Sequence, residues 1–122
     1  MEECIRQRRI LAEEFRESRK IFLALGDKTR QHIFLSILEN EAIGMRVPEI
    51  TVKTHLSRPA VSHHLRILKE SGIVRMYRKG TRNYYYADVS RSGWSHLKKL
   101  ADLADTIIRK AAEAGYPHIE EE

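Results

Sequence analysis

The 122-residue chain has a single cysteine, no long hydrophobic run and no signal-like N-terminus, and each of these shortages excludes something. Because Cys4 stands alone, no disulfide can form within one chain, which fits a reducing compartment. No apolar run approaches the roughly 20 residues that a membrane helix needs, and the first residues lack the apolar core of a signal peptide. We therefore expect a soluble, cytoplasmic protein that does not associate with membranes.

Catalytic and cofactor motifs are missing as well. The chain has neither a phosphate-binding glycine loop nor the histidine spacing of zinc hydrolases. Ser62-His63-His64 sets a hydroxyl beside two imidazoles, but neighbouring helical positions point about 100° apart. No acid is placed to orient either ring. We expect no enzyme, no catalytic residue and no cofactor.

Positive charge is concentrated in the middle of the chain. Residues 46–82 contain nine lysines and arginines against two acids, a net charge of +7, whereas the whole chain carries +5. Clustered cations bind a polyanion by releasing its condensed counterions, so this segment favours a nucleic-acid partner. An ordinary solvated basic face is the alternative. The length itself predicts one domain, residues 1–122.

Amphipathic helices are expected at both ends of the chain. The first runs from Glu2 to Lys20, within an N-terminal segment 1–22, and the last occupies 92–114. Asp27 can cap a further helix between them. The apolar or tolerated positions that recur at spacings of three and four along the first helix are Cys4, Arg8, Leu11, Phe15, Ser18 and Phe22. The stripe of the last helix is Trp94, Leu97, Ala101, Ala104, Ile108 and Ala111.

The middle of the chain predicts a helix-turn-helix over 47–72 followed by a β-hairpin wing over 73–88. Pro48 suits the start of a short helix, and Ser57 can cap a second one. After Gly72 the period changes to β-branched and aromatic runs around a basic, glycine-containing tip. The expected fold is mainly α-helical with one small hairpin, a winged helix-turn-helix. The residues expected to face inward from the second helix are Val61, Leu65 and Leu68.

The outward side chains of that second helix are candidates for contact with DNA. The second helix of a helix-turn-helix lies in the major groove, and the N-terminus at Ser57 can hold a phosphate. His64 lies beside the inward stripe, so a structural role and a direct contact both stay open. The hairpin tip is either a second contact or a solubilising turn. The candidates on the helix are Arg58, Ser62, His63, Arg66 and Lys69. Those on the hairpin are Arg78, Lys79, Thr81 and Arg82.

Four segments resemble the arsenic-repressor (ArsR/SmtB) family of winged-helix regulators: residues 25–30, 47–50, 56–65 and 68–74. The resemblance extends over about 22–90. It implies a homodimer, joined through the first and last helices, that binds a palindromic operator on double-stranded DNA and represses until an inducer arrives. Apolar stripes on terminal helices fit a dimer independently, although each stripe can instead fold back on its own core. In the family, residues in the positions of Arg58, Ser62 and His63 contact DNA.

The resemblance also implies a sensed signal, often a metal, and here the sequence departs from the family pattern. One family site uses Cys-x-Cys before the recognition helix, but residues 45–50 contain no cysteine. Another uses Asp-x-His and later histidines in the last helix. Here Ser90 stands two positions after Asp88, where the pattern requires histidine, and residues 106–112 contain no histidine. The other histidines lack partners at metal-ligand spacing: His32, His55, His96 and His118. We expect no metal site.

Two questions are left by the sequence. The inducer is unknown. The alternatives to a metal are a small molecule and a disulfide between the Cys4 residues of two subunits. For Cys4 itself, a half-buried structural thiol is the simpler interpretation. A protein-interaction module that keeps the winged-helix shape without reading DNA sequence is the rival hypothesis. The basic helix face argues against it, because protein interfaces concentrate aromatic and apolar anchors.

Overall fold

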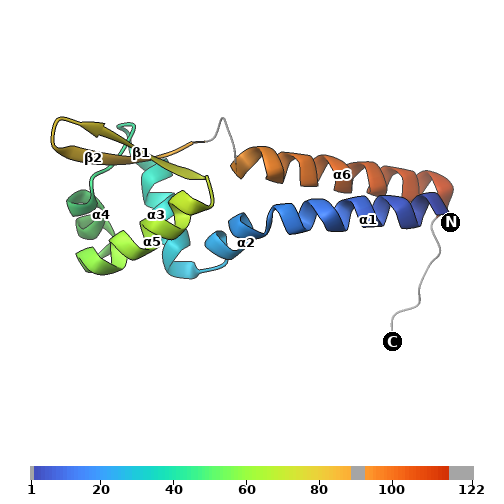
Figure 1. Ribbon diagram of the computed structural model, residues 1–122, viewed down its shortest axis with the longest axis horizontal. Coiled ribbons are helices and arrows are strands. Elements are labelled where there is room, and N and C mark those ends of the chain that lie inside the picture. The colour runs from blue at the N-terminus through green and yellow to red at the C-terminus, as the bar shows by residue number, and fades with distance from the viewer. Residues whose placement is uncertain (1, 89–92, 116–122) are drawn as a thin grey trace. The chain divides into compact units, whose positions relative to one another are not determined.

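The structure is a computed structural model that describes residues 2–88 and 93–115 (Figure 1). It contains helices and one hairpin, as predicted. One compact unit comprises residues 2–18 with 96–115, and a second comprises residues 19–88 with 93–95. The elements in chain order are α1 (Glu2–Glu17), α2 (Arg19–Leu25), α3 (Lys28–Glu39), α4 (Val47–Thr54), α5 (Arg58–Glu70), β1 (Val74–Lys79), β2 (Arg82–Ala87) and α6 (Gly93–Ala114).

The second unit is the predicted winged helix-turn-helix. Helices α3, α4 and α5 pack against one another, and the β1–β2 hairpin packs against α3 and α5. Its core is formed by side chains that are almost completely buried, each at most 2% exposed. Burying such aliphatic side chains is the main force that holds the helices together. The core includes Ile33, Ile50, Val61, Leu65, Leu68, Ile73 and Val74.

Helix α3 begins where the sequence predicts. Asp27 has extended backbone angles, and its Oδ1 accepts a hydrogen bond from the backbone N–H of Arg30 at 2.9 Å. That backbone bond lowers the pKa of the Asp27 carboxyl, because it stabilises the charged form. The cap satisfies one of the amides that the first turn of a helix leaves unpaired.

The turn between α4 and α5 fixes the angle at which α5 leaves the core. His55 ends α4 in the left-handed conformation, with φ of 60°, and its backbone N–H donates to the carbonyl of Thr51. Ser57 then caps α5, since its Oγ accepts from the N–H of Ala60 at 3.3 Å. The two helices lie within one residue of the bounds that their caps predict.

The wing is a tight antiparallel hairpin in which Lys79 pairs with Arg82 across a two-residue turn. Gly80, the first turn residue, has φ of +63°, as a type II′ turn requires. The structure adds a contact that the sequence did not predict: Met45 bridges Tyr85 through two backbone hydrogen bonds of 2.8 Å. The hairpin is thus anchored to the segment that leads into α4.

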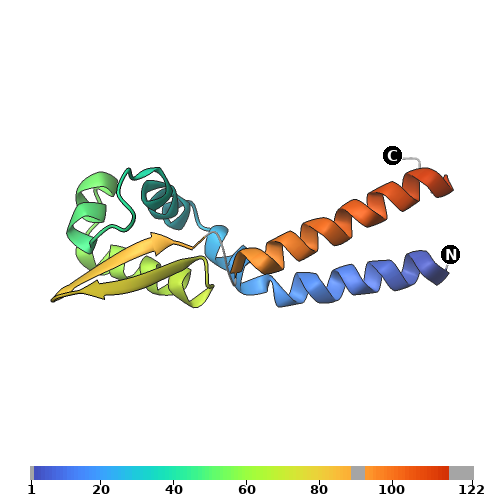
Figure 2. The ribbon, with the colours of Figure 1, turned by 90° about the horizontal axis from the view of Figure 1, so that it is seen from above.

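The first unit is a pair of helices, α1 and α6, which lie side by side and run in opposite directions (Figures 1 and 2). The prediction of one continuous helix from Glu2 to Lys20 was wrong, because α1 ends at Glu17 and α2 starts at Arg19. Ser18 between them is fully buried, and its Oγ donates to the carbonyl of Glu14 at 3.0 Å. A serine hydroxyl that bonds back to the i−4 carbonyl commonly bends a helix.

The predicted stripes of both terminal helices are covered only in part by the chain itself. In α1 the covered face includes Glu14 rather than Phe15, which is 52% exposed, and Arg8 is exposed as well. In α6 the stripe residues Ala101 and Ile108 are exposed. The stripe residues that the single chain leaves exposed are open to cover by a second copy, and that cover stays a prediction.

Burial of the acidic Glu14 is compensated by two partners on α6. His96 Nδ1 lies 3.0 Å from Glu14 Oε1, and Lys99 Nζ lies 3.4 Å from Oε2. A carboxylate can only accept, so the His96 nitrogen donates. This hydrogen bond is the main cause that lowers the pKa of Glu14. The contact explains His96, which the sequence left without a partner.

Candidate nucleic-acid interface

Helix α5 has two chemically opposite faces. Val61, Leu65 and Leu68 are at most 1% exposed and pack into the core. All five predicted contacts on the helix are exposed on its other side, and every one of them carries a hydrogen-bond donor. The exposed cap, Ser57, leaves the positive N-terminal end of the helix open. The five residues are Arg58, Ser62, His63, Arg66 and Lys69.

Two of these side chains are ordered against each other. An Nη of Arg66 lies 3.4 Å from Nδ1 of His63, one turn earlier on the helix. Because a guanidinium can only donate, His63 Nδ1 is the acceptor and Nε2 carries the ring hydrogen. His63 therefore presents a donor at Nε2, which suits an acceptor on a base edge or a phosphate oxygen.

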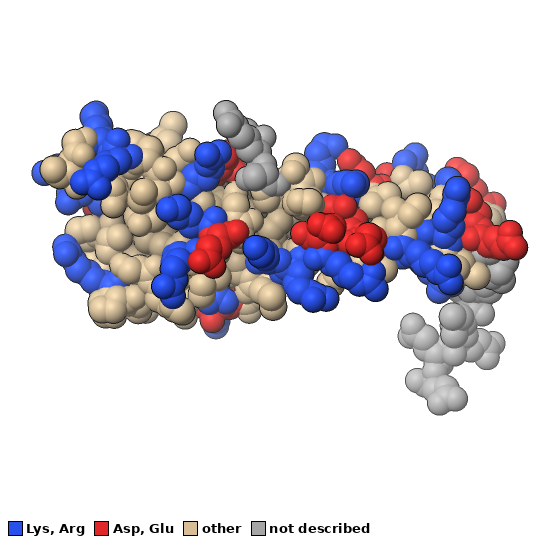
Figure 3. All heavy atoms as spheres, in the orientation of Figure 1, with Lys and Arg blue, Asp and Glu red and all other residues tan. Residues whose placement is uncertain are grey.

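The four predicted wing residues are exposed at the tip of the hairpin. Arg78 Nε donates to the carbonyl of Gly80 at 3.2 Å, which closes the turn against its strand. In Figure 3, lysine and arginine atoms gather over this tip. Phosphate groups are recognised by such cations without regard to sequence. The residues are Arg78, Lys79, Thr81 and Arg82.

His64 differs from its neighbour His63 because it is half-buried and points back towards the start of α3. Its Nδ1 lies 3.4 Å from Nη1 of Arg30, a residue that the sequence did not single out as functional. Burial is the main cause that lowers the pKa of His64. The signal for Arg30 was present only as part of the family-like segment 25–30.

The remaining histidines and Cys4 do not gather into a site in the described residues. His55 caps α4 and His96 binds Glu14, while His32 is exposed on α3. His118 and the segment 118–120 lie outside the described residues. Within residues 2–88 and 93–115, no three side chains of the types His, Cys, Asp and Glu lie close enough to hold a metal ion. Cys4 is half-buried and forms no disulfide within the chain.

Comparison with known proteins identifies the family. Residues 27–76, which contain α3, α4, α5 and the start of the wing, match the profile described as bacterial regulatory protein, arsR family. An HTH-type transcriptional regulator of Methanocaldococcus jannaschii is 40% identical over 95 residues, which is 78% of this chain and 99% of that protein. The chain belongs to the arsR family of regulatory proteins. It is a winged helix-turn-helix, DNA-binding regulator of transcription.

Two further matches extend the comparison. The transcriptional repressor SdpR of Bacillus subtilis is 37% identical over 65 residues, 53% of this chain and 69% of the repressor. The solution structure of a homodimeric winged helix-turn-helix DNA-binding domain from Mycobacterium bovis has a TM-score of 0.57 and 22% identity, and it covers 91% of this chain and 92% of its own. That likeness shows the fold.

In the described part of this arsR-family chain, no helix is long and apolar enough to cross a membrane.

Proposed function

We propose that this regulator is a homodimeric repressor that reads a palindromic operator without the usual metal sites of its family. Helix α5 enters the major groove, and the wing contacts the neighbouring backbone or minor groove. The observation that carries the proposal is the two-faced α5, whose five predicted contacts are all exposed while the opposite face is buried. The repressor role is supported by the similarity to SdpR, which is described as a transcriptional repressor.

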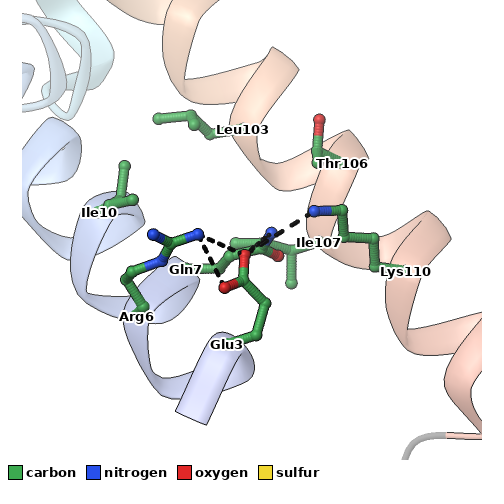
Figure 4. Close-up of a pocket in the computed structure, with 8 residues that line it drawn as sticks. All are labelled: Glu3, Arg6, Gln7, Ile10, Leu103, Thr106, Ile107 and Lys110. Atoms are coloured by element: carbon green, nitrogen blue, oxygen red, sulfur yellow. Dashed lines mark hydrogen bonds and ion pairs between the residues drawn. The ribbon is translucent and has the colours of Figure 1, made fainter. Parts of the chain in front are cut away.

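Dimer formation is supported by the helix pair of the first unit. Ile10 and Ile108 are 46% and 67% exposed, and α6 buries no residue except Gly93 among those described. Between the helices is a pocket of about 200 Å³ with Ile10, Leu103 and Ile107 in its lining (Figure 4). Apolar side chains from both helices line this pocket, and an exposed apolar face of this kind suits cover by a second copy of the chain. The similar domain of Mycobacterium bovis is homodimeric.

If the protein is a dimer, one substitution in the interface should halve its mass in solution. Sedimentation equilibrium of the wild type should give twice the 14.3 kDa of the chain. Ile108→Asp should give the mass of one chain, because a charge on this apolar face cannot be buried without a partner. Circular dichroism establishes that the variant is folded. A wild type of 14.3 kDa at every concentration, or a dimeric Ile108→Asp, would refute this interface.

Contact between the wing and phosphate predicts a change in salt dependence. For Lys79→Ala, affinity for selected and random duplexes should fall together, and the slope of log K against log salt should decrease by about 1. Lys98→Ala, which removes the same charge from an exposed position of α6 outside the pocket lining, serves as the control and should keep the wild-type slope. Equal slopes for Lys79→Ala and the wild type would show that the wing does not touch the backbone.

Selection of duplexes from a random pool tests the function itself. Bound sequences should converge on an inverted repeat whose half-sites are about one helical turn apart. Fluorescence anisotropy should then show affinity for the selected duplex at least about a thousandfold above that for a scrambled one. Absence of binding even at low salt would favour the rival protein-interaction module. Repeating the selection with metals, oxidants and small molecules searches for the inducer.

A further inference from the structure

The start of α3 and the recognition helix α5 are joined by the side chain of Arg30. Its Nε donates to the carbonyl of Ala24 at 2.8 Å, and Nη2 donates to the carbonyl of Leu23 at 3.1 Å. Both carbonyls belong to the last turn of α2, where helical carbonyls lack partners within the helix. The third direction of the guanidinium, Nη1, faces Nδ1 of His64 at 3.4 Å. One planar group therefore touches α2 and α5 from α3.

The geometry sets the protonation of His64. A guanidinium stays charged and offers only donors, so His64 Nδ1 must be an unprotonated acceptor. The backbone of Arg30 is held as well, because its N–H donates to the capping carboxylate of Asp27. Arg30 is thus held both at its backbone and by the Nε and Nη2 atoms of its guanidinium. A neutral His64 completes the arrangement.

His64 is also in contact with the surface that faces DNA. The ring centroids of His63 and His64 are 5.4 Å apart, and the rings meet edge to face with an interplanar angle of 60°. His63 in turn lies next to Arg66. The half-buried histidine therefore connects the junction of α2 and α3 to two of the exposed donors of α5.

We infer that Arg30 and His64 are positioning residues: together they fix the direction of α5, so that operator affinity depends on a neutral His64 accepting from Arg30. The inference rests on the proposed function, because it concerns how the same helix reads DNA. It assigns neither residue a contact with the nucleic acid. Its consequence is that acid should loosen the recognition helix.

The surrounding charges determine the sign of this pH dependence. Burial, Arg30 and His63 all lower the pKa of His64 below its ordinary value of 6.5, and only Asp27 raises it. Two other elements packed against α5 are α4 and β1, which bury only uncharged side chains: Ile50, Thr54 and Val74. The charged side chains on the side of α2 are Lys20 of α2 and Glu70 of α5, which line a pocket together with Arg30. The neutral contact is therefore complete above pH 6.5 and is lost as the pH falls through the lowered pKa.

Three variants of the full chain test the inference on a selected duplex. His64→Asn keeps an acceptor near the position of Nδ1 but does not titrate. His64→Leu removes the acceptor, and Arg30→Lys keeps the charge but loses the fork. At about pH 7.5, His64→Leu and Arg30→Lys should each bind about tenfold more weakly, equivalent to about 1.4 kcal/mol, and the double variant no more weakly than either. His64→Asn should stay within about threefold of the wild type.

Two further measurements separate positioning from direct contact. All variants should keep the wild-type salt slope, whereas a lost phosphate contact would lower it by about 1. Between about pH 7.5 and 5.5 the wild type should weaken relative to His64→Asn, and the comparison cancels every group that the two proteins share. If His64 touches phosphate, the wild type would instead gain affinity over His64→Asn in acid, which overturns the inference.

The outcomes also distinguish this inference from the proposed function. If the wild type shows no preference among duplexes, the proposed function fails and the inference fails with it. If the wild type discriminates but His64→Leu and Arg30→Lys bind equally well, the inference alone is wrong. Thermal unfolding at each pH establishes that the proteins compared are folded. If His64→Leu does not fold, the pH comparison between the wild type and His64→Asn decides.

Discussion

Replacing Arg58 and His63 together by alanine should remove about 1–3 kcal/mol of operator binding for each base contact that is lost. Both side chains are exposed on α5, and Arg58 is its first residue, close to the end that enters the groove. A forked guanidinium suits the two acceptors of guanine. Truncation leaves the buried face of the helix untouched, so the fold should be unchanged. Anisotropy with selected and scrambled duplexes measures the effect.

The double variant needs a control for charge, because removing any arginine weakens attraction to DNA. Arg9→Ala removes one positive charge from an exposed position of α1. It should lower affinity for both duplexes slightly and equally, whereas Arg58→Ala/His63→Ala should lower the preference for the selected one. If both variants lower the two affinities in parallel, the exposed face of α5 does not read bases.

Replacing Leu65 by alanine should destabilise the winged unit by about 2–5 kcal/mol, since the side chain is 1% exposed and its removal leaves a cavity. Leu65 lies between Val61 and Leu68 on the face by which α5 packs into the core. Chemical denaturation monitored by circular dichroism gives the free energy of unfolding. Small domains are stable by only about 5–15 kcal/mol, so the variant should be close to unfolding at growth temperatures.

Leu23→Ala is the matched control for this prediction. Leu23 is 65% exposed on α2, and the hydrogen bond to Arg30 uses its backbone carbonyl, which the substitution keeps. Its unfolding free energy should stay within about 0.5 kcal/mol of the wild type. Comparable losses in the two variants would mean that Leu65 does not fill the core as described.

Local signals explain why the winged unit could be predicted from the sequence. Asp27 and Ser57 each cap a helix through an amide three residues away, and Gly80 fixes the hairpin turn. Such contacts depend on a few neighbouring residues, as does the spacing of Val61, Leu65 and Leu68. Once these three residues are assigned to the core, the remaining side chains of α5 are expected on its exposed face. The same logic placed all the candidate contacts on the surface, although their contact with DNA stays a prediction.

Contacts between distant residues explain what the sequence could not give. The hydrogen bond between His64 and Arg30 spans 34 positions, and that between Glu14 and His96 spans 82. Neither has a local pattern, because the packing of whole helices brings the partners together. The end of α1 was missed because Ser18 looks like a tolerated position in a stripe, yet its hydroxyl is buried and donates back to the carbonyl of Glu14.

Dimethyl sulfate protection on a selected operator tests the central claim, that α5 of each subunit reads the major groove. Methylation occurs at guanine N7, which lies in that groove. We predict two protected clusters about 10–10.5 base pairs apart, both weakened in Arg58→Ala/His63→Ala at concentrations that still saturate the duplex. Strong binding with no protected guanine in either half-site, or protection unchanged in the double variant, would contradict the account.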